Sequence, residues 1–140
     1  LNIKNLMNLN KNSRIYIAGH NGMVGSAIHN LLKKKKYNNI ITASRKSLDL
    51  LNQKKTENFL KKNRPNFVII AAAKVGGILI NQKNKADFIY QNLTIQNNLI
   101  HSSYKVGVKK LIFLGSSCIY PKLASQPLKE KYLLNGMLEE

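Results

Sequence analysis

Residues 15–25 of the chain read IYIAGHNGMVG, and this stretch decides the fold. Its first four residues are apolar or aromatic and rich in strand formers, which predicts a short buried strand that stops at Gly19. From Met23 the pattern changes to helical spacing, with apolar residues at Val24, Ile28, Leu31 and Leu32. The stretch therefore predicts a strand, a glycine turn and a helix in direct succession.

Alternation of strand and helix continues along the chain. Further strands are predicted at residues 40–43, 67–73 and 110–114, with helices at residues 54–62 and 85–104. Strands separated by helices build a parallel sheet through right-handed crossovers. We therefore expect an α/β fold, a Rossmann-type doubly wound parallel sheet with strand order 3-2-1-4. It is incomplete, with about four strands, and a short helical turn is predicted near residues 129–134.

Composition limits the classes of protein that fit. The chain has 140 residues, one cysteine and three histidines, which suits one domain and predicts neither a disulfide framework nor a metal site. The longest apolar run, residues 67–73, is too short to span a membrane, and no secretory leader is recognisable. We therefore expect a cytoplasmic protein that does not bind a membrane.

The net charge of +17 raises the alternative of a nucleic-acid-binding domain. The lysine runs fall at predicted helix ends, are not interleaved with aromatic residues and match no major-groove motif. The joint abundance of Lys, Asn and Ile indicates a coding bias that spreads lysine over the surface. We therefore expect no nucleic-acid partner.

Three glycines at a spacing of three form the first chemical signal. One glycine permits a tight turn, a second lets the backbone approach a pyrophosphate, and a third allows close packing of helix on strand. The N-terminus of the following helix offers free N–H groups to phosphate oxygens. The pattern predicts a dinucleotide site formed by Gly19, His20, Asn21, Gly22, Met23, Val24 and Gly25.

The end of the second predicted strand indicates which dinucleotide binds. An NAD site usually has an acidic residue there, whereas this chain has Arg45, which can hold a 2′-phosphate. The predicted cofactor is therefore NADP, with Asp49 and Leu50 near the adenine edge. Ligands bind at the carboxyl ends of parallel strands, so the end of the third strand is expected to contribute further residues. These are Ala72 and Ala73 for the cofactor and Lys74 and Gly76 for the substrate.

Four blocks of sequence carry a family resemblance. They read IAGHNGMVGSAI at 17–28, AAAKVGGI at 71–78, ADFIYQN at 86–92 and FLGSSCIYPK at 113–122. On these blocks the chain resembles the GDP-L-fucose synthase family of extended short-chain dehydrogenases/reductases. The resemblance implies an NADPH-dependent epimerase/reductase that converts GDP-4-keto-6-deoxy-mannose to GDP-L-fucose. It also implies a GDP-sugar substrate and, for the full-length enzyme, a homodimer packed through the helix at 85–104.

The resemblance assigns roles by position. Ser116 matches the serine that polarises the 4-keto oxygen, and Cys118 matches the base of the epimerisations. The end of the family's fourth strand that faces the cofactor corresponds in this chain to Leu114, Gly115, Ser116 and Ser117. Holding the ketone oxygen stabilises enolate charge, and a thiolate of lowered pKa is a workable base. Without its neighbours, Cys118 would read as a small apolar residue.

The family's reductive step also needs a Tyr-x-x-x-Lys pair, which the chain lacks, since none of its six tyrosines is followed by such a lysine. We therefore expect an N-terminal fragment. Residues 1–13 are a weakly ordered lead-in, and residues 14–140 are the N-terminal part of an NADP-binding domain without a substrate domain. The chain alone is not expected to catalyse the full reaction. The alternative left open is a dinucleotide-binding module without turnover.

Overall fold

Strand β1 (Ile15–Ala18) lies inside a four-stranded sheet, and all four of its side chains are buried. The computed structural model describes residues 9–139. The other strands are β2 (Ile40–Thr42), β3 (Phe67–Ile70) and β4 (Lys110–Phe113), and every pairing is parallel. The fold class expected from the sequence is therefore confirmed.

The strand order is β2-β1-β3-β4, so the predicted order 3-2-1-4 is wrong. Strand β2 has three half-buried residues and suits an edge, whereas β3 is a largely buried apolar run that suits the interior beside β1. The chain leaves β2, crosses β1 and adds β3 on its far side. Because each crossover is right-handed, this change of direction places the helix between β2 and β3 on the opposite face of the sheet from the helix between β1 and β2.

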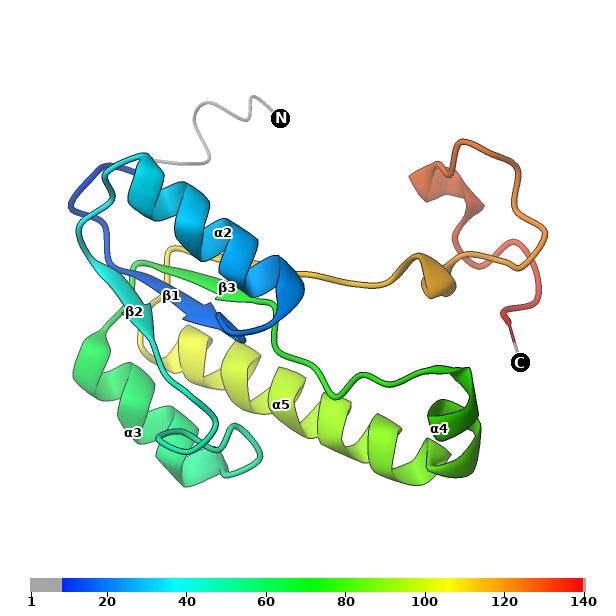
Figure 1. Cartoon of the computed structure of the whole chain (residues 1–140), viewed down its shortest axis with the longest axis horizontal. Helices are drawn as coiled ribbons and strands as arrows, with labels where there is room; N and C mark the ends of the chain where they lie inside the picture. The colour runs from blue at the N-terminus through cyan, green and yellow to red at the C-terminus, as the bar shows by residue number, and fades with distance from the viewer. Residues whose placement is uncertain (1–8, 140) are drawn as a thin grey trace.

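Helices cover both faces, as Figure 1 shows: α2 (Met23–Lys34) lies on one side, and α3 (Gln53–Asn63) with α5 (Lys85–Lys105) on the other. Successive side chains of each strand point to opposite faces of the sheet, so each strand contributes to the packing under both helical layers. On the α2 side, Ile15, Ile17 and Phe67 form a small core. The larger core lies under α3 and α5 and contains Tyr16, Ala18, Leu48, Leu60, Val68, Ile70 and Leu99.

Helix α5 has two apolar stripes along its length. Phe88 and Leu99 are buried, and Ile95 packs against the larger core. The second stripe remains exposed at Ile89, Leu93 and Ile100. Helix α5 therefore presents an apolar outer face in addition to the face that covers the sheet.

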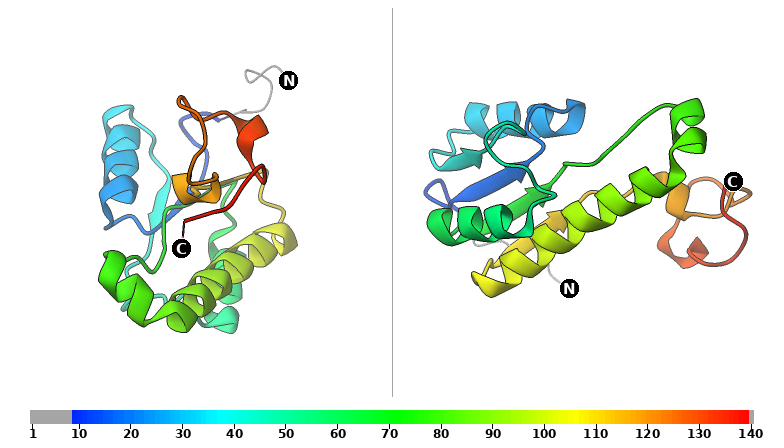
Figure 2. Two further views of the ribbon diagram at one scale, coloured as in Figure 1. Left: turned by 90° about the vertical axis from the view of Figure 1, so that its right-hand side faces the viewer. Right: turned by 90° about the horizontal axis from the view of Figure 1, so that it is seen from below.

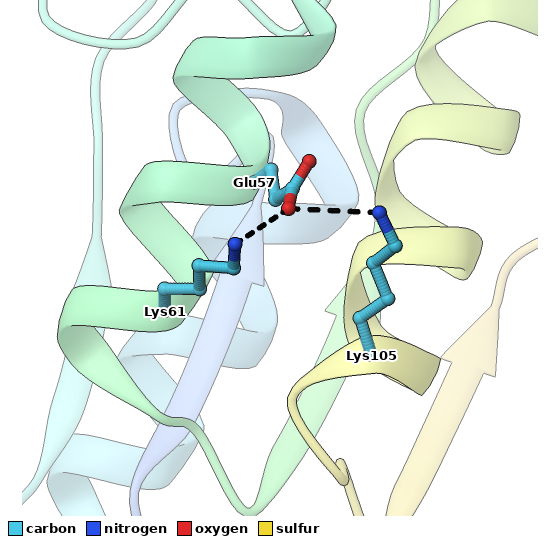
Figure 3. Close-up of polar contacts among 3 residues, drawn as sticks. All are labelled: Glu57, Lys61 and Lys105. Atoms are coloured by element: carbon cyan, nitrogen blue, oxygen red, sulfur yellow. Dashed lines mark ion pairs between the residues drawn. The ribbon is translucent and has the colours of Figure 1, made fainter.

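A shared carboxylate ties α3 to α5 (Figure 3). Glu57 Oε1 on α3 lies 2.7 Å from Lys61 Nζ of the same helix and 3.6 Å from Lys105 Nζ on α5. The i,i+4 spacing of Glu57 and Lys61 is the favourable orientation within a helix. The ion pair between Glu57 and Lys105 therefore adds a polar contact to the apolar packing of the two helices.

Several predicted boundaries change. Strand β3 ends at Ile70, so residues 71–73 are not part of it, and a short helix α4 (Ile78–Lys83) precedes α5 without having been predicted. Of the predicted lead-in, residues 1–8 lie outside the described residues. The described part of the lead-in is bonded to the chain before β2: the Asn38 N–H donates to the Lys11 carbonyl, and Asn39 Nδ2 donates to the Asn12 carbonyl.

The C-terminal segment (residues 115–139) runs beyond the carboxyl edge of the sheet, as Figures 1 and 2 show. It contains two short 3-10 helices, η1 (Ser117–Ile119) and η2 (Glu130–Tyr132), and the second lies where a helical turn was predicted. Between residues 9 and 139, no helix has the length and apolar character that a membrane crossing needs.

Candidate cofactor-binding site

The glycine turn (residues 19–22) joins β1 to α2 and requires its first glycine. Gly19 has φ +84°, and a Cβ built there would lie 2.6 Å from the amide nitrogen of Ala72. The turn is closed by the Gly22 N–H, which donates to the Gly19 carbonyl at 3.0 Å. A side chain at Gly19 would therefore strain the backbone and push the turn away from the end of β3.

Gly25 is required for a different reason. It is buried in the first turn of α2, and a Cβ there would lie 2.1 Å from the Gly19 carbonyl oxygen. Helix α2 can approach β1 this closely only because residue 25 has no side chain. This is the third glycine role expected from the sequence.

The middle glycine is not explained by the protein's own packing. Gly22 has extended backbone angles, and a Cβ there would make only an ordinary contact, 3.4 Å from Gly19 O. It is the N-cap of α2 but offers no side chain to the first-turn N–H groups, and that turn has no acidic residue. The positive end of the helix is therefore open to an anion such as a pyrophosphate.

A cleft of about 430 Å³ begins at this turn and runs along the carboxyl edge of the sheet. Ten residues predicted to contact cofactor or substrate line it: Gly19, His20, Asn21, Gly22, Arg45, Asp49, Leu50, Ala72, Ala73 and Lys74. A second hollow of about 270 Å³ shares the wall at residues 71–73 and adds the predicted Val24, Leu114 and Gly115. The structure thus brings most of the predicted cofactor residues to one continuous edge.

Arg45 lies at the end of the cleft formed after β2. It sits in a turn in which the Leu48 N–H donates to the Ser44 carbonyl at 2.9 Å. Across residues 9–139, no carboxylate forms an ion pair with Arg45. The neighbouring Asp49 carboxylate accepts from the Leu51 N–H at 3.0 Å. The Arg45 guanidinium is therefore available for a phosphate.

His20 forms part of the cleft wall in a positively charged neighbourhood. Its ring meets the edge of His29 on α2 at 5.9 Å between centroids, and its Nδ1 is buried without a hydrogen-bond partner among the described residues. Desolvation lowers the pKa of His29, and electrostatic repulsion from Lys33 and His20 lowers it further. Protonation of His29 is therefore disfavoured.

Two asparagines on α5 hold backbone that lines the cleft. Asn92 bonds both backbone groups of Lys74, accepting from its N–H at 2.7 Å and donating to its carbonyl at 2.9 Å. Asn98 donates to the carbonyls of Leu50 at 2.8 Å and Leu51 at 3.3 Å. The sequence prediction did not include Asn98.

Further lining residues were also missed, namely Ala43, Leu48, Leu51, Ala71, Val75, Gln91, Ile95 and Gln96. The α5 residues among them had a readable signal. Gln91 and Ile95 lie three and seven positions after Phe88, so they share the inward face of the helix. The alanines and leucines had no chemical signal, because they contribute shape rather than polar groups.

The remaining predicted residues do not line either hollow. Met23 is 87% exposed, and Gly76 packs against Ile80 and Phe88. Ser116, Ser117 and Cys118 lie at η1 in the C-terminal segment, where the Cys118 N–H donates to Ser116 Oγ at 3.2 Å and the thiol is free and exposed. Within the described part of the chain, no group of three His, Cys, Asp or Glu side chains gathers at a metal-binding spacing.

Comparison with known proteins agrees with this geometry. Residues 15–139 match the NAD dependent epimerase/dehydratase family, and the chain belongs to this family of enzymes. It is 56% identical over 126 residues to the GDP-L-fucose synthase of Sinorhizobium fredii, an alignment that covers 90% of this chain and 40% of that protein. The resemblance inferred from the sequence blocks is therefore confirmed.

Solved structures show the same fold. A GDP-mannoheptose C4 reductase from Campylobacter jejuni with NADP bound has a TM-score of 0.89 and 46% identity, covering 94% of this chain and 41% of that one. A GDP-L-fucose synthetase from Naegleria fowleri bound to NADP has a TM-score of 0.84 and 30% identity, covering 96% of this chain and 40% of that one. The chain spans about 40% of the length of the curated relatives it matches.

Proposed function

We propose that the chain supplies the NADPH-binding part of an enzyme that epimerises and reduces GDP-4-keto-6-deoxy-mannose to GDP-L-fucose. One observation carries this proposal: the cleft joins an open helix N-terminus at Gly22 to Arg45, which forms no ion pair with a carboxylate of residues 9–139. The first suits a pyrophosphate and the second a 2′-phosphate. Relatives and solved structures with GDP-sugar or NADP in their names support the cofactor and the substrate class.

The residues present fit this cofactor at each end. Gly22 leaves room for phosphate oxygens beside the α2 N–H groups, and Arg45 offers a planar fork of donors. Leu48, Leu50 and Ile95 give the cleft apolar walls suited to a base. When bound, NADPH supplies the hydride for reduction at C4.

In this proposal, Ser116 and Cys118 provide the chemistry on the sugar. The Ser116 hydroxyl donates a hydrogen bond to the 4-keto oxygen, which acidifies the neighbouring carbons. The exposed Cys118 thiol, once deprotonated, removes a proton from one of these carbons. Leu114 and Gly115 line the second hollow and lead directly into these residues.

We also propose that the enzyme is a homodimer. The exposed apolar stripe of α5 and the exposed Ile78 and Leu79 of α4 support association with a second copy. Light scattering of the purified protein at several concentrations tests this, and a mass of one chain at all of them contradicts it.

Cofactor binding is tested by calorimetric titration of the chain with NADPH and with NADH. We expect tighter binding of NADPH, and we expect Arg45→Gln to weaken it by about tenfold, as loss of a charge-assisted hydrogen bond does, while NADH binding is unchanged. Lys46→Gln, one residue further along, is the matched control and should bind like the wild type. Equal affinity for both dinucleotides would remove Arg45 from its role. Binding of neither would refute the proposed function.

A further inference from the structure

Asn98 is a buried polar side chain that the proposed chemistry does not use. It lies on the inward face of α5 and is 8% exposed. Its side-chain nitrogen donates to two carbonyls of one distant loop, Leu50 O at 2.8 Å and Leu51 O at 3.3 Å. A buried amide with both of its bonds on one loop fixes the position of that loop against the helix.

The loop at residues 48–52 satisfies two other carbonyls locally, since Asp49 O accepts from the Asn52 N–H and Asn52 O accepts from the Thr56 N–H. Its N–H groups bond locally, that of Leu48 to Ser44 O, that of Leu51 to the Asp49 carboxylate and that of Asn52 to Asp49 O. Asn98 takes the two carbonyls between Asp49 and Asn52. The conformation of the loop is thus set jointly by local turns and by this one side chain from α5.

The same loop is a wall of the cleft. Leu48, Asp49, Leu50 and Leu51 all line it at the end where Arg45 lies. Leu50 also packs against the core beneath α5, so this apolar contact and the hydrogen bond from Asn98 both hold the loop against the helix. Without Asn98, two partly buried carbonyls would lose their donor, and the loop would lower its energy by turning them toward water.

From this geometry we infer that Asn98 is a positioning residue for cofactor binding, which preorganises the adenosine end of the cleft by holding residues 50 and 51. The inference rests on the proposed function. A preformed wall lowers the ordering cost of binding, so its loss weakens every ligand that uses this end. Asn92 bonds the backbone of Lys74, which follows β3, so the two asparagines hold different walls of the cleft.

The test is titration of the full chain with NADPH and with adenosine 2′,5′-bisphosphate, which carries only the adenosine end. Asn98→Leu removes the donor at nearly constant volume and places no charge in the interior. We expect both ligands to bind about tenfold more weakly, by the same factor, as loss of this bonded contact implies. Asn97→Leu, on the exposed face of the same helix, is the control and should leave both affinities unchanged.

Thermal unfolding separates positioning from stability. If Asn98 only stabilises the fold, Asn98→Leu melts at a lower temperature but binds both ligands with wild-type affinity while folded. That result overturns the inference, as does a loss for NADPH without a loss for adenosine 2′,5′-bisphosphate. Asn98→Ser replaces Asn98→Leu if the latter does not fold, with the same expectation. Failure of the wild type to bind either ligand refutes the proposed function instead.

Discussion

The glycine turn and the C-terminal segment contribute to one proposed site but are built differently. A Cβ added at Gly19 or Gly25 would lie 2.6 or 2.1 Å from neighbouring backbone, and the turn joins the buried strand β1 to α2. In the segment at 115–139, every hydrogen bond and ion pair recorded for the described residues is internal to it. Large apolar side chains such as Leu123 and Leu134 are more than nine-tenths exposed there.

In our proposal, this difference places the residues for cofactor recognition and the residues for catalysis in differently packed parts of the chain. The phosphate and adenosine contacts that we propose depend on β1, β2, β3 and α5, which pack against one another within the described chain. The residues proposed for sugar chemistry lie in a segment whose hydrogen bonds and ion pairs, among the described residues, do not reach the sheet. We therefore expect dinucleotide binding to survive changes in the C-terminal segment and to fail on small changes in the glycine turn.

The largest effect is expected from Gly25→Ala. Its methyl group would meet the Gly19 carbonyl oxygen, which belongs to the backbone and cannot swing aside. Overpacking of this kind costs about 1–3 kcal/mol of unfolding free energy, measurable by urea denaturation. Gly115→Ala is the counterpart in the other region. No atom lies within 4 Å of its added methyl group, so its stability should stay at the wild-type value. Equal losses would mean that the two regions are packed alike.

In a second test, Gly22→Ala should change the affinity for the cofactor more than the stability of the fold. Its methyl group makes only an ordinary contact with the protein, so the unfolding free energy should fall by less than about 1 kcal/mol, the scale of an N-cap change. The same methyl stands where phosphate oxygens approach, and NADPH should bind at least about tenfold more weakly, the factor that corresponds to 1.4 kcal/mol. Calorimetry measures this loss. Unchanged affinity would place the pyrophosphate elsewhere.

The smallest effect concerns two carboxylates that form ion pairs, Glu57 on α3 beside the sheet and Glu139 in the C-terminal segment. A hydrogen bond from Lys61 lowers the pKa of Glu57, and Lys105, Lys61 and Lys54 add to this against the opposing effect of desolvation. A carboxyl whose pKa is lowered by folding stabilises the fold above its unfolded pKa of about 4.5 and loses that contribution as the pH falls through its folded pKa.

Melting temperatures between pH 7 and pH 3 measure this contribution. Glu57→Gln should flatten part of the wild-type decline, because glutamine does not titrate. Glu139→Gln removes the pair between Glu139 and Lys122, whose side chains are both 56% exposed, and it should leave the decline unchanged. A larger effect from Glu139 would show that the C-terminal segment is fixed more firmly than α3 and α5.

Much of this arrangement could be predicted from local pattern. The spacing of apolar residues located the four strands and three of the helices, and the glycine spacing identified the turn. Strand order could not be read in the same way, because it depends on which side of β1 the chain crosses after β2. The six-residue α4 is too short to show a helical period, and Asn98 acts through a loop 47 positions away. The homodimer and the cytoplasmic location remain predictions.

Backbone amide chemical shifts recorded during titration of the chain with NADPH test the central claim most directly. We expect saturable changes at residues 19–25, 45–51 and 71–74 and none at residues 121–139. That result would show that the cofactor cleft is formed without the C-terminal segment. Changes confined to the lysine run at residues 33–36, or none that saturate, would contradict it.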